Sequence, residues 1–230
     1  MFEHIKTIAF DADDTLWVNE TYFRDTEAHF GELLAGFETP NQIQQELFKT
    51  EIENLKDYGY GIKGFILSMI ECGIKLSNGE LTASQTQKII DFGKEMLNHP
   101  VELLPGVERV LSTLYGRYKL LLVTKGDLLD QERKLEKSGL AKYFTQVRVL
   151  SDKQEKDYQN LLDGMGTDPK EFLMVGNSLK SDVLPLVNIG ASAVHIPFHT
   201  TWAHEEAEPK EHQDYLSLNE LGDIIPYFED

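Results

Sequence analysis

The chain has 230 residues, a formal net charge of −17 and one cysteine. Hydrophobic residues make up 41% and charged residues 27%, an ordinary globular composition that allows one core with a smaller appended domain. The acidic balance argues against a partner that is nucleic acid or an anionic membrane, because both require clustered Lys and Arg. No apolar run approaches the roughly 20 residues that span a bilayer, and no signal-peptide pattern is visible. Because Cys72 cannot form an internal disulfide, we expect a cytoplasmic protein.

The first part of the chain combines one strand with a long helical stretch. Residues 5–10 form an apolar run that predicts a buried strand, and it stops at a cluster of acidic residues. From about residue 19 to 98, apolar residues recur at helical spacing and no strand pattern interrupts them. The pattern predicts helices over 20–35, 41–57, 62–72 and 82–97. We therefore expect an all-helical domain, residues 18–98, inserted after the first strand.

After Pro105-Gly106 the predicted strands and helices alternate. Strands are predicted over 118–123, 146–150, 171–175 and 192–196, and helices over 107–115, 127–138, 154–163, 180–188 and 217–228. Such alternation is typical of βαβ units, which build a parallel sheet covered by helices on both faces. The predicted fold class is therefore α/β, a three-layer Rossmann-type core made of residues 1–17 and 99–230.

Polar residues follow the predicted strands at four separate places. They are Asp11 and Asp13, then Thr124-Lys125-Gly126, then 151–153, and finally 176–182. Because ligands bind at the carboxyl ends of the strands in such sheets, we expect these groups to meet at one edge. Together they supply carboxylates, a hydroxyl and lysines, which favours a phosphate site containing a metal ion.

In these residues the sequence resembles the haloacid dehalogenase superfamily, in its phosphohydrolase branch. Four motifs occur in order and cover the core: D-x-D-x-T at 11–15, a strand ending in Thr124, Lys153 after a later strand, and G-x-x-x-x-x-D at 176–182. The resemblance implies an α/β core with an alpha-helical cap. It also implies hydrolysis of a small phosphorylated metabolite.

The resemblance implies a role for each matching residue. Asp11 would be the nucleophile that forms an aspartyl-phosphate, and Asp13 the general acid and base, a contribution of roughly 10²–10⁴-fold. The substrate phosphate would be bound by Thr124, Lys125, Gly126 and Lys153. The cofactor would be Mg²⁺, held by Asp11, the Asp13 carbonyl, Asp182 and Asn177.

The sequence departs from the family pattern at two positions. Asn177 stands where relatives carry an acidic residue, so we expect weaker magnesium binding, directly or through water. Lys125 stands where many relatives have Asn, and Lys156 is a second candidate for the third-motif lysine; we prefer Lys153, which directly follows the strand. In the dehalogenases the position of Asp13 is not acidic, so its presence favours phosphate chemistry.

Several alternatives remain open from sequence. A phosphomutase shares every core motif, and Asn177 also allows a weakly active phosphate-binding protein. Residues 59–64 match G-x-G-x-x-G but follow a predicted helix, so we interpret them as a helix-to-helix turn. His195, His199 and His204 do not have the spacing of a zinc site. The oligomeric state and the substrate cannot be derived from the sequence.

Overall fold

The structure, a computed structural model, describes residues 2–207 and 215–228. It divides into two compact units. The α/β unit comprises Met1–Glu20, Val101–Lys125 and Gln131–Asp230, and the helical unit comprises Thr21–Pro100 and Gly126–Asp130. The predicted domain limits, 1–17 and 99–230 against 18–98, stay a prediction.

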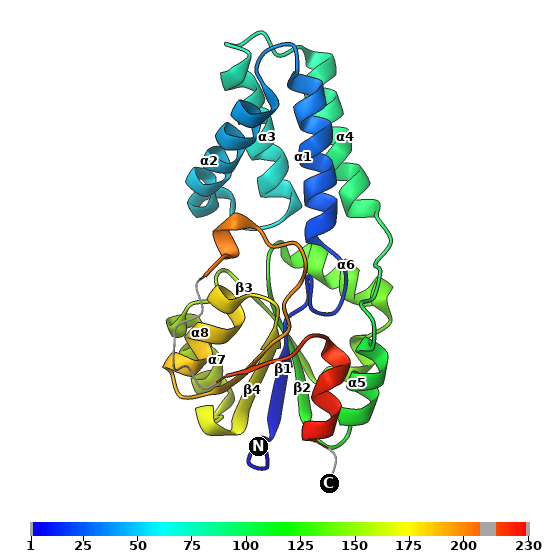
Figure 1. Cartoon of the computed structure of the whole chain (residues 1–230), viewed down its shortest axis with the longest axis vertical. Helices are drawn as coiled ribbons and strands as arrows, with labels where there is room; N and C mark the ends of the chain where they lie inside the picture. Colours follow the sequence, from blue (N-terminus) through cyan, green and yellow to red (C-terminus); the bar gives the residue numbers. More distant parts are fainter. Residues whose placement is uncertain (1, 208–214, 229–230) are drawn as a thin grey trace. The chain divides into compact units, whose positions relative to one another are not determined.

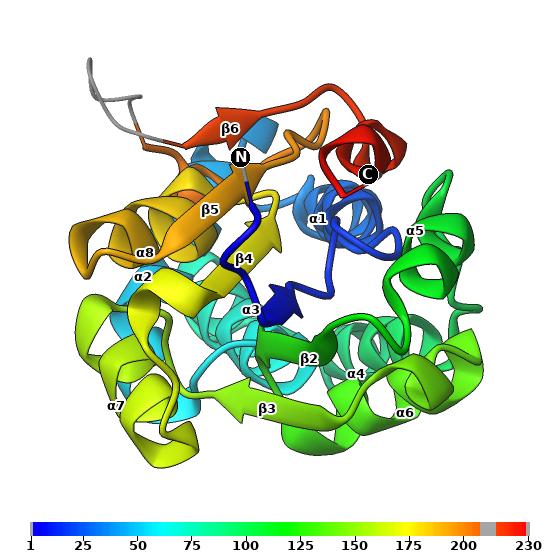
Figure 2. The ribbon, with the colours of Figure 1, turned by 90° about the horizontal axis from the view of Figure 1, so that it is seen from below.

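The α/β unit contains a six-stranded sheet in the order β3-β2-β1-β4-β5-β6 (Figures 1 and 2). All neighbouring strands pair in parallel. The strands are β1 (Thr7–Phe10), β2 (Lys119–Lys125), β3 (Gln146–Leu150), β4 (Phe172–Gly176), β5 (Ser192–His195) and β6 (Leu216–Ser217). The predicted α/β class with a parallel, Rossmann-type sheet is confirmed. The carboxyl end of β1, where Asp11 follows, lies between the ends of β2 and β4.

Helices cover both faces of this sheet, as Figure 2 shows. The alternation of side chains along the central strands decides which face each residue contacts. Ile8 and Phe10 pack on the side of α5 (Val107–Leu114) and α6 (Leu128–Ser138). Ala9 packs on the other side, with the core residues of α7 (Glu155–Met165) and α8 (Leu184–Asn188). Both faces are therefore buried, and the edge at the strand ends remains for polar groups.

Two sequence-based predictions were wrong in detail. The expected closing helix over 217–228 is a short strand, β6, followed by a 3₁₀ segment, Leu221–Tyr227. Pro226 lies inside that segment and has no amide hydrogen for an α-helical bond. The expected helix over 180–188 begins as a π-helical turn, Leu179–Val183, before α8.

The helical unit is built from four helices and has its own core. They are α1 (Glu20–Leu34), α2 (Pro40–Tyr58), α3 (Ile62–Leu76) and α4 (Ala83–Asn98) (Figure 1). Its core includes Phe30, Met69 and Ile89, all fully buried. The G-x-G-x-x-G segment is the predicted turn between helices, since Gly59 follows α2 and Gly61 precedes α3, both at positive φ.

Within the described ranges, no helix combines the length and the apolarity that crossing a membrane requires.

Candidate active site

The third-motif lysine brings two of the predicted carboxylates together. Lys153 Nζ lies 2.5 Å from Asp11 Oδ1 and 2.7 Å from Asp182 Oδ1. The side chain of Lys153 is 2% exposed, and those of Asp11 and Asp182 are 8% and 1% exposed. Three charged groups from the ends of β1, β3 and β4 thus form one buried cluster. Lys156, the alternative lysine, is exposed.

Burial and charge act in opposite directions on this cluster. Burial raises the pKa of the Asp11 carboxyl from its usual 3.8 to about 7, although the nearby Lys153 ammonium opposes this shift. Burial by itself would lower the pKa of Lys153, but the adjacent Asp11 and Asp182 carboxylates raise it well above its usual range. Lys153 therefore stays protonated at neutral pH and supplies the positive charge of the cluster.

The π-helical turn after β4 explains how Asp182 reaches the cluster. Asp182 Oδ2 accepts a hydrogen bond of 3.0 Å from the Ser178 amide, and this contact folds the side chain back toward the strand end. A Cβ atom on Gly176 would lie 2.4 Å from the Asp182 carboxylate, so only glycine leaves room for it. The glycine that begins the fourth motif is therefore required because the Asp182 carboxylate occupies the space where a side chain would lie.

Asn177 lies beside the Asp11 carboxylate and the Asp13 backbone carbonyl. With its amide nitrogen turned inward, Asn177 reaches Asp11 Oδ2 at 3.2 Å and the Asp13 carbonyl at 3.3 Å. Mg²⁺ prefers oxygen ligands, and this edge offers the Asp11 and Asp182 carboxylates, the Asp13 carbonyl and, when its amide turns over, the Asn177 side-chain oxygen. Across residues 2–207 and 215–228, no three His, Cys, Asp or Glu side chains form a metal-binding group. The donor set fits magnesium with two carboxylates, one amide and one carbonyl.

The Asp13 carboxylate is held by residues that the motifs did not indicate. It accepts hydrogen bonds from Trp17 Nε1 at 2.7 Å, Gln131 Nε2 at 2.7 Å and Lys134 Nζ at 2.9 Å. Gln131 and Lys134 are three positions apart on α6, so they share one face of that helix. The sequence shows that Gln131 and Lys134 share a helix face, but it does not show that this face contacts Asp13.

Asp14 is a second residue whose importance the sequence did not show. Its φ angle is +62°, a left-handed conformation that Asp tolerates better than most residues. Its carboxylate accepts hydrogen bonds from the backbone amides of Asn19 and Glu20, at the start of α1. Burial raises the pKa of Asp14 to about 8, against the opposing effect of these hydrogen bonds. Asp14 therefore fixes the path of the chain from the first motif into α1.

Besides Lys153, three residues are predicted to bind phosphate, Thr124, Lys125 and Gly126, and their surroundings differ from one another. Thr124 is buried at the end of β2, whereas Gly126 belongs to the helical unit. The Lys125 ammonium pairs with Glu205 and lies 3.0 Å from Ser181 Oγ. Phosphate binding by the Lys125 side chain would require this pair to open. The sequence did not indicate Glu205 as its partner.

Glu205 has a side chain that is only 12% exposed and accepts several hydrogen bonds. Its carboxylate accepts hydrogen bonds from Ser178 Oγ at 2.7 Å and Ser181 Oγ at 2.5 Å, besides its pair with Lys125. Burial alone would raise the pKa of Glu205, but Lys125 and the serine hydroxyls lower it from 4.5 to about 2. The network ties the segment after β5 to the π-helical turn that carries Asp182.

Glu205→Gln should therefore reduce stability in a pH-dependent way. A carboxyl whose pKa is lowered on folding stabilises the fold fully above pH 4.5 and loses this contribution as the pH falls toward 2. We expect a lower free energy of unfolding at neutral pH, by at most on the order of 3 kcal/mol, and a shrinking difference between pH 4.5 and 2. Denaturant titrations across this range measure it. The exposed neighbour Glu206→Gln is the control; a pH-independent difference between Glu205→Gln and the wild type would contradict the expectation.

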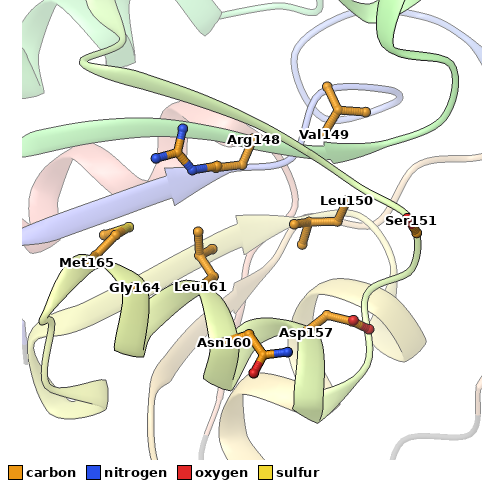
Figure 3. A pocket seen from close by; sticks show the side chains of 9 residues that line it. All are labelled: Arg148, Val149, Leu150, Ser151, Asp157, Asn160, Leu161, Gly164 and Met165. Carbon is orange, nitrogen blue, oxygen red and sulfur yellow. The ribbon is translucent and has the colours of Figure 1, made fainter.

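Other candidate groups lie outside this cluster. Cys72 is buried in α3, and burial raises the pKa of its thiol to about 12, so it packs as a small apolar residue. His195 is the last residue of β5, and its ring nitrogen Nε2 lies 3.0 Å from the Asn177 carbonyl. A pocket of about 420 Å³ lies between β3 and α7; Ser151 of the predicted group 151–153 lines it, but no residue with a predicted catalytic, phosphate-binding or metal-binding role does (Figure 3).

The comparison with protein families agrees with this arrangement. Residues 5–190 match the model of the haloacid dehalogenase-like hydrolases. The chain belongs to this family. A solved haloacid dehalogenase-like family hydrolase from Xanthomonas campestris is 36% identical to it, with a TM-score of 0.87. That alignment covers 98% of this chain and 90% of the other.

Curated relatives of this haloacid dehalogenase-like hydrolase are named as phosphatases. The N-acylneuraminate-9-phosphatase of Mus musculus is 26% identical over 56% of this chain and 54% of its own length. The pyrimidine 5'-nucleotidase YjjG of Escherichia coli is 30% identical over 53% of this chain and 56% of its own. The chain thus spans about half the length of these relatives. The pyrimidine 5'-nucleotidase PynA of Streptococcus pneumoniae, 26% identical, is covered over 85% of its length and 80% of this chain.

Proposed function

We propose that this hydrolase is a magnesium-dependent phosphatase that acts on a small phosphorylated metabolite through an aspartyl-phosphate on Asp11. One observation carries the proposal: the ammonium of Lys153 lies between the Asp11 and Asp182 carboxylates at the carboxyl end of the sheet. A buried cation beside a carboxylate nucleophile is the arrangement that an incoming phosphate dianion needs. The relatives named as phosphatases support the same reaction class.

In the first step, Asp11 attacks phosphorus and the bond to the leaving oxygen breaks. Lys153 binds a phosphoryl oxygen, and Thr124 presents its hydroxyl at the end of β2. Asp13 gives its proton to the leaving oxygen and then takes a proton from the water that attacks the phosphoryl group. Free phosphate leaves, and both carboxyl groups return to their starting forms.

Magnesium would be held by Asp11, Asp182, the Asp13 carbonyl and Asn177. When bound, it neutralises the charge that accumulates when the phosphate approaches the carboxylate. The predicted phosphate-binding roles of Lys125 and Gly126 remain part of the proposal, as does the role of the helical unit as a cap that selects the substrate.

The proposal is tested with sugar phosphates, nucleotides and glyceraldehyde 3-phosphate, assayed for released phosphate with Mg²⁺ and with a chelator. We expect magnesium-dependent release from at least one substrate. Slow release that accelerates with a bisphosphate activator would instead indicate a phosphomutase. Binding without turnover on any substrate or on an aryl phosphate would indicate a phosphate-binding protein.

Asn177→Asp should strengthen the metal site. A carboxylate adds one negative charge beside Asp11 and the Asp13 carbonyl, which Asn177 already reaches. We expect a lower half-saturating Mg²⁺ concentration, by roughly tenfold, because charge count and ligand environment set the affinity of such sites. Calorimetric titration of Mg²⁺ measures this without turnover. An unchanged or higher concentration would contradict the account of the missing charge.

A further inference from the structure

The Asp13 carboxylate has a set of donors that the phosphatase chemistry described above does not use. Oδ1 accepts from both Trp17 Nε1 and Lys134 Nζ, and Oδ2 accepts from Gln131 Nε2. All four residues belong to the α/β unit. Trp17 lies in the loop after β1. Gln131 and Lys134 lie on α6, 118 and 121 residues after Asp13 in the sequence.

The groups that contact the Asp13 carboxylate are mostly buried. Trp17 is 1% exposed and Gln131 is 3% exposed, whereas the side chains of Lys134 and Asp13 are 16% and 22% exposed. A buried indole or amide N–H needs an acceptor, and Asp13 supplies one to each. Lys134 adds a charge-assisted hydrogen bond and also donates to Asn19 Oδ1 at 2.8 Å. The carboxylate is therefore held in one orientation by groups that are themselves fixed.

The two carboxylate oxygens are not equivalent. Oδ1 has two donors and Oδ2 has one, so Oδ2 has more capacity left for a proton. Within the described part of the chain, the side-chain oxygen of Gln131 is buried without a hydrogen-bond partner. By turning its amide, Gln131 can donate to the ionised carboxylate or accept from an Oδ2–H group. Gln131 can therefore form a hydrogen bond with Asp13 whether the carboxyl group is ionised or protonated.

We propose that Lys134, together with Trp17 and Gln131, positions the Asp13 carboxyl for proton transfer, with Oδ2 as the oxygen that carries the proton. This inference rests on the proposed function. In the first step the Asp11 carboxylate oxygen bonds to phosphorus, the bond between phosphorus and the leaving oxygen breaks, and that oxygen takes the proton from Oδ2. In the second step the oxygen of a water molecule bonds to phosphorus, the bond between phosphorus and the Asp11 carboxylate oxygen breaks, and one proton of that water goes to Oδ2. Lys134 holds Oδ1 throughout and is a positioning residue.

The test compares two substrates that differ in their need for a proton. Glycerol phosphate releases an alkoxide that must be protonated, whereas p-nitrophenyl phosphate releases a stable phenolate. The ratio kcat/KM reports the step in which the leaving group departs. For Lys134→Met we expect kcat/KM on glycerol phosphate to fall by roughly tenfold or more, within the range of general acid catalysis, and on p-nitrophenyl phosphate by less than about threefold.

Matched variants separate positioning from a purely structural role. Lys134→Arg keeps a cation and should recover part of the loss, and Arg133→Met removes an exposed cation from the same helix and should change neither substrate. Gln131→Met should show the same dependence on the leaving group. Equal losses on both substrates, or no loss on either, would overturn the inference.

A different set of results would refute the proposed function. Like Lys134→Met, Asp13→Asn should lose more activity on glycerol phosphate than on p-nitrophenyl phosphate. Asp11→Asn should be inactive on both substrates. If these two variants behave as expected while Lys134→Met follows the wild type, only the inference about Lys134 is wrong. If Asp11→Asn keeps its activity, the proposed function is wrong.

Discussion

Asp11→Asn is expected to abolish phosphate release, by roughly four orders of magnitude or more, because the amide cannot form the covalent intermediate. The fold should survive the change. Burial disfavours the ionised form of Asp11; the Lys153 ammonium opposes this effect and the Asp182 carboxylate adds to it, so the pKa of Asp11 is raised on balance. Asn has nearly the same shape and carries no charge, and Lys153 keeps Asp182 as its partner at 2.7 Å.

The measurement is phosphate release from an aryl phosphate with Mg²⁺, together with thermal unfolding of the same preparation. Asp25→Asn, an exposed position on α1, is the control and should behave as wild type. Near-native turnover by a folded Asp11→Asn protein would refute the nucleophile assignment. Lost turnover with lost folding would be resolved by Asp11→Glu, which keeps the charge but misplaces the oxygen and should also be inactive.

Lys153→Met is expected to reduce both stability and activity. The substitution leaves two buried carboxylates, Asp11 and Asp182, without the ammonium that contacts both of them. Removing one partner of a buried ionic group costs roughly 3–5 kcal/mol in free energy of unfolding. Activity should fall by about 10²-fold or more, since the phosphoryl oxygens lose a buried cation.

Magnesium gives this prediction a specific signature. A divalent cation bound by the same carboxylates should restore part of the lost stability, so Mg²⁺ should raise the unfolding temperature more in Lys153→Met than in the wild type. Lys156→Met, three residues along and exposed, is the matched control and should be neutral. If Lys156→Met instead shows the losses and Lys153→Met does not, the third motif has been assigned to the wrong lysine.

The sequence was sufficient for the contacts that follow from strand order. Asp11, Lys153 and Asp182 each follow a strand of a parallel sheet, and the shared carboxyl edge brings such residues together. The need for glycine at position 176 was also implicit in the motif, although its reason, the space occupied by the Asp182 carboxylate, required coordinates.

The sequence was insufficient where a contact depends on how a helix or loop is rotated. Lys134 and Gln131 meet Asp13 only because α6 packs with that face toward the loop after β1. Glu205 lies in a short 3₁₀ segment, Ala203–Glu205, whose path no periodicity encodes. The helix expected over 217–228 is instead β6 and a 3₁₀ segment, in which Pro226 has no amide hydrogen for an α-helical bond.

The central claim is that Asp11 carries the phosphoryl group during turnover. The most direct measurement is acid quenching of the enzyme during steady-state turnover with Mg²⁺, followed by peptide mass spectrometry. We predict one phosphoryl adduct, confined to the peptide that contains Asp11, absent without substrate and absent in Asp11→Asn. An adduct on another residue, or turnover with no adduct at any quench time together with an active Asp11→Asn protein, would contradict the account.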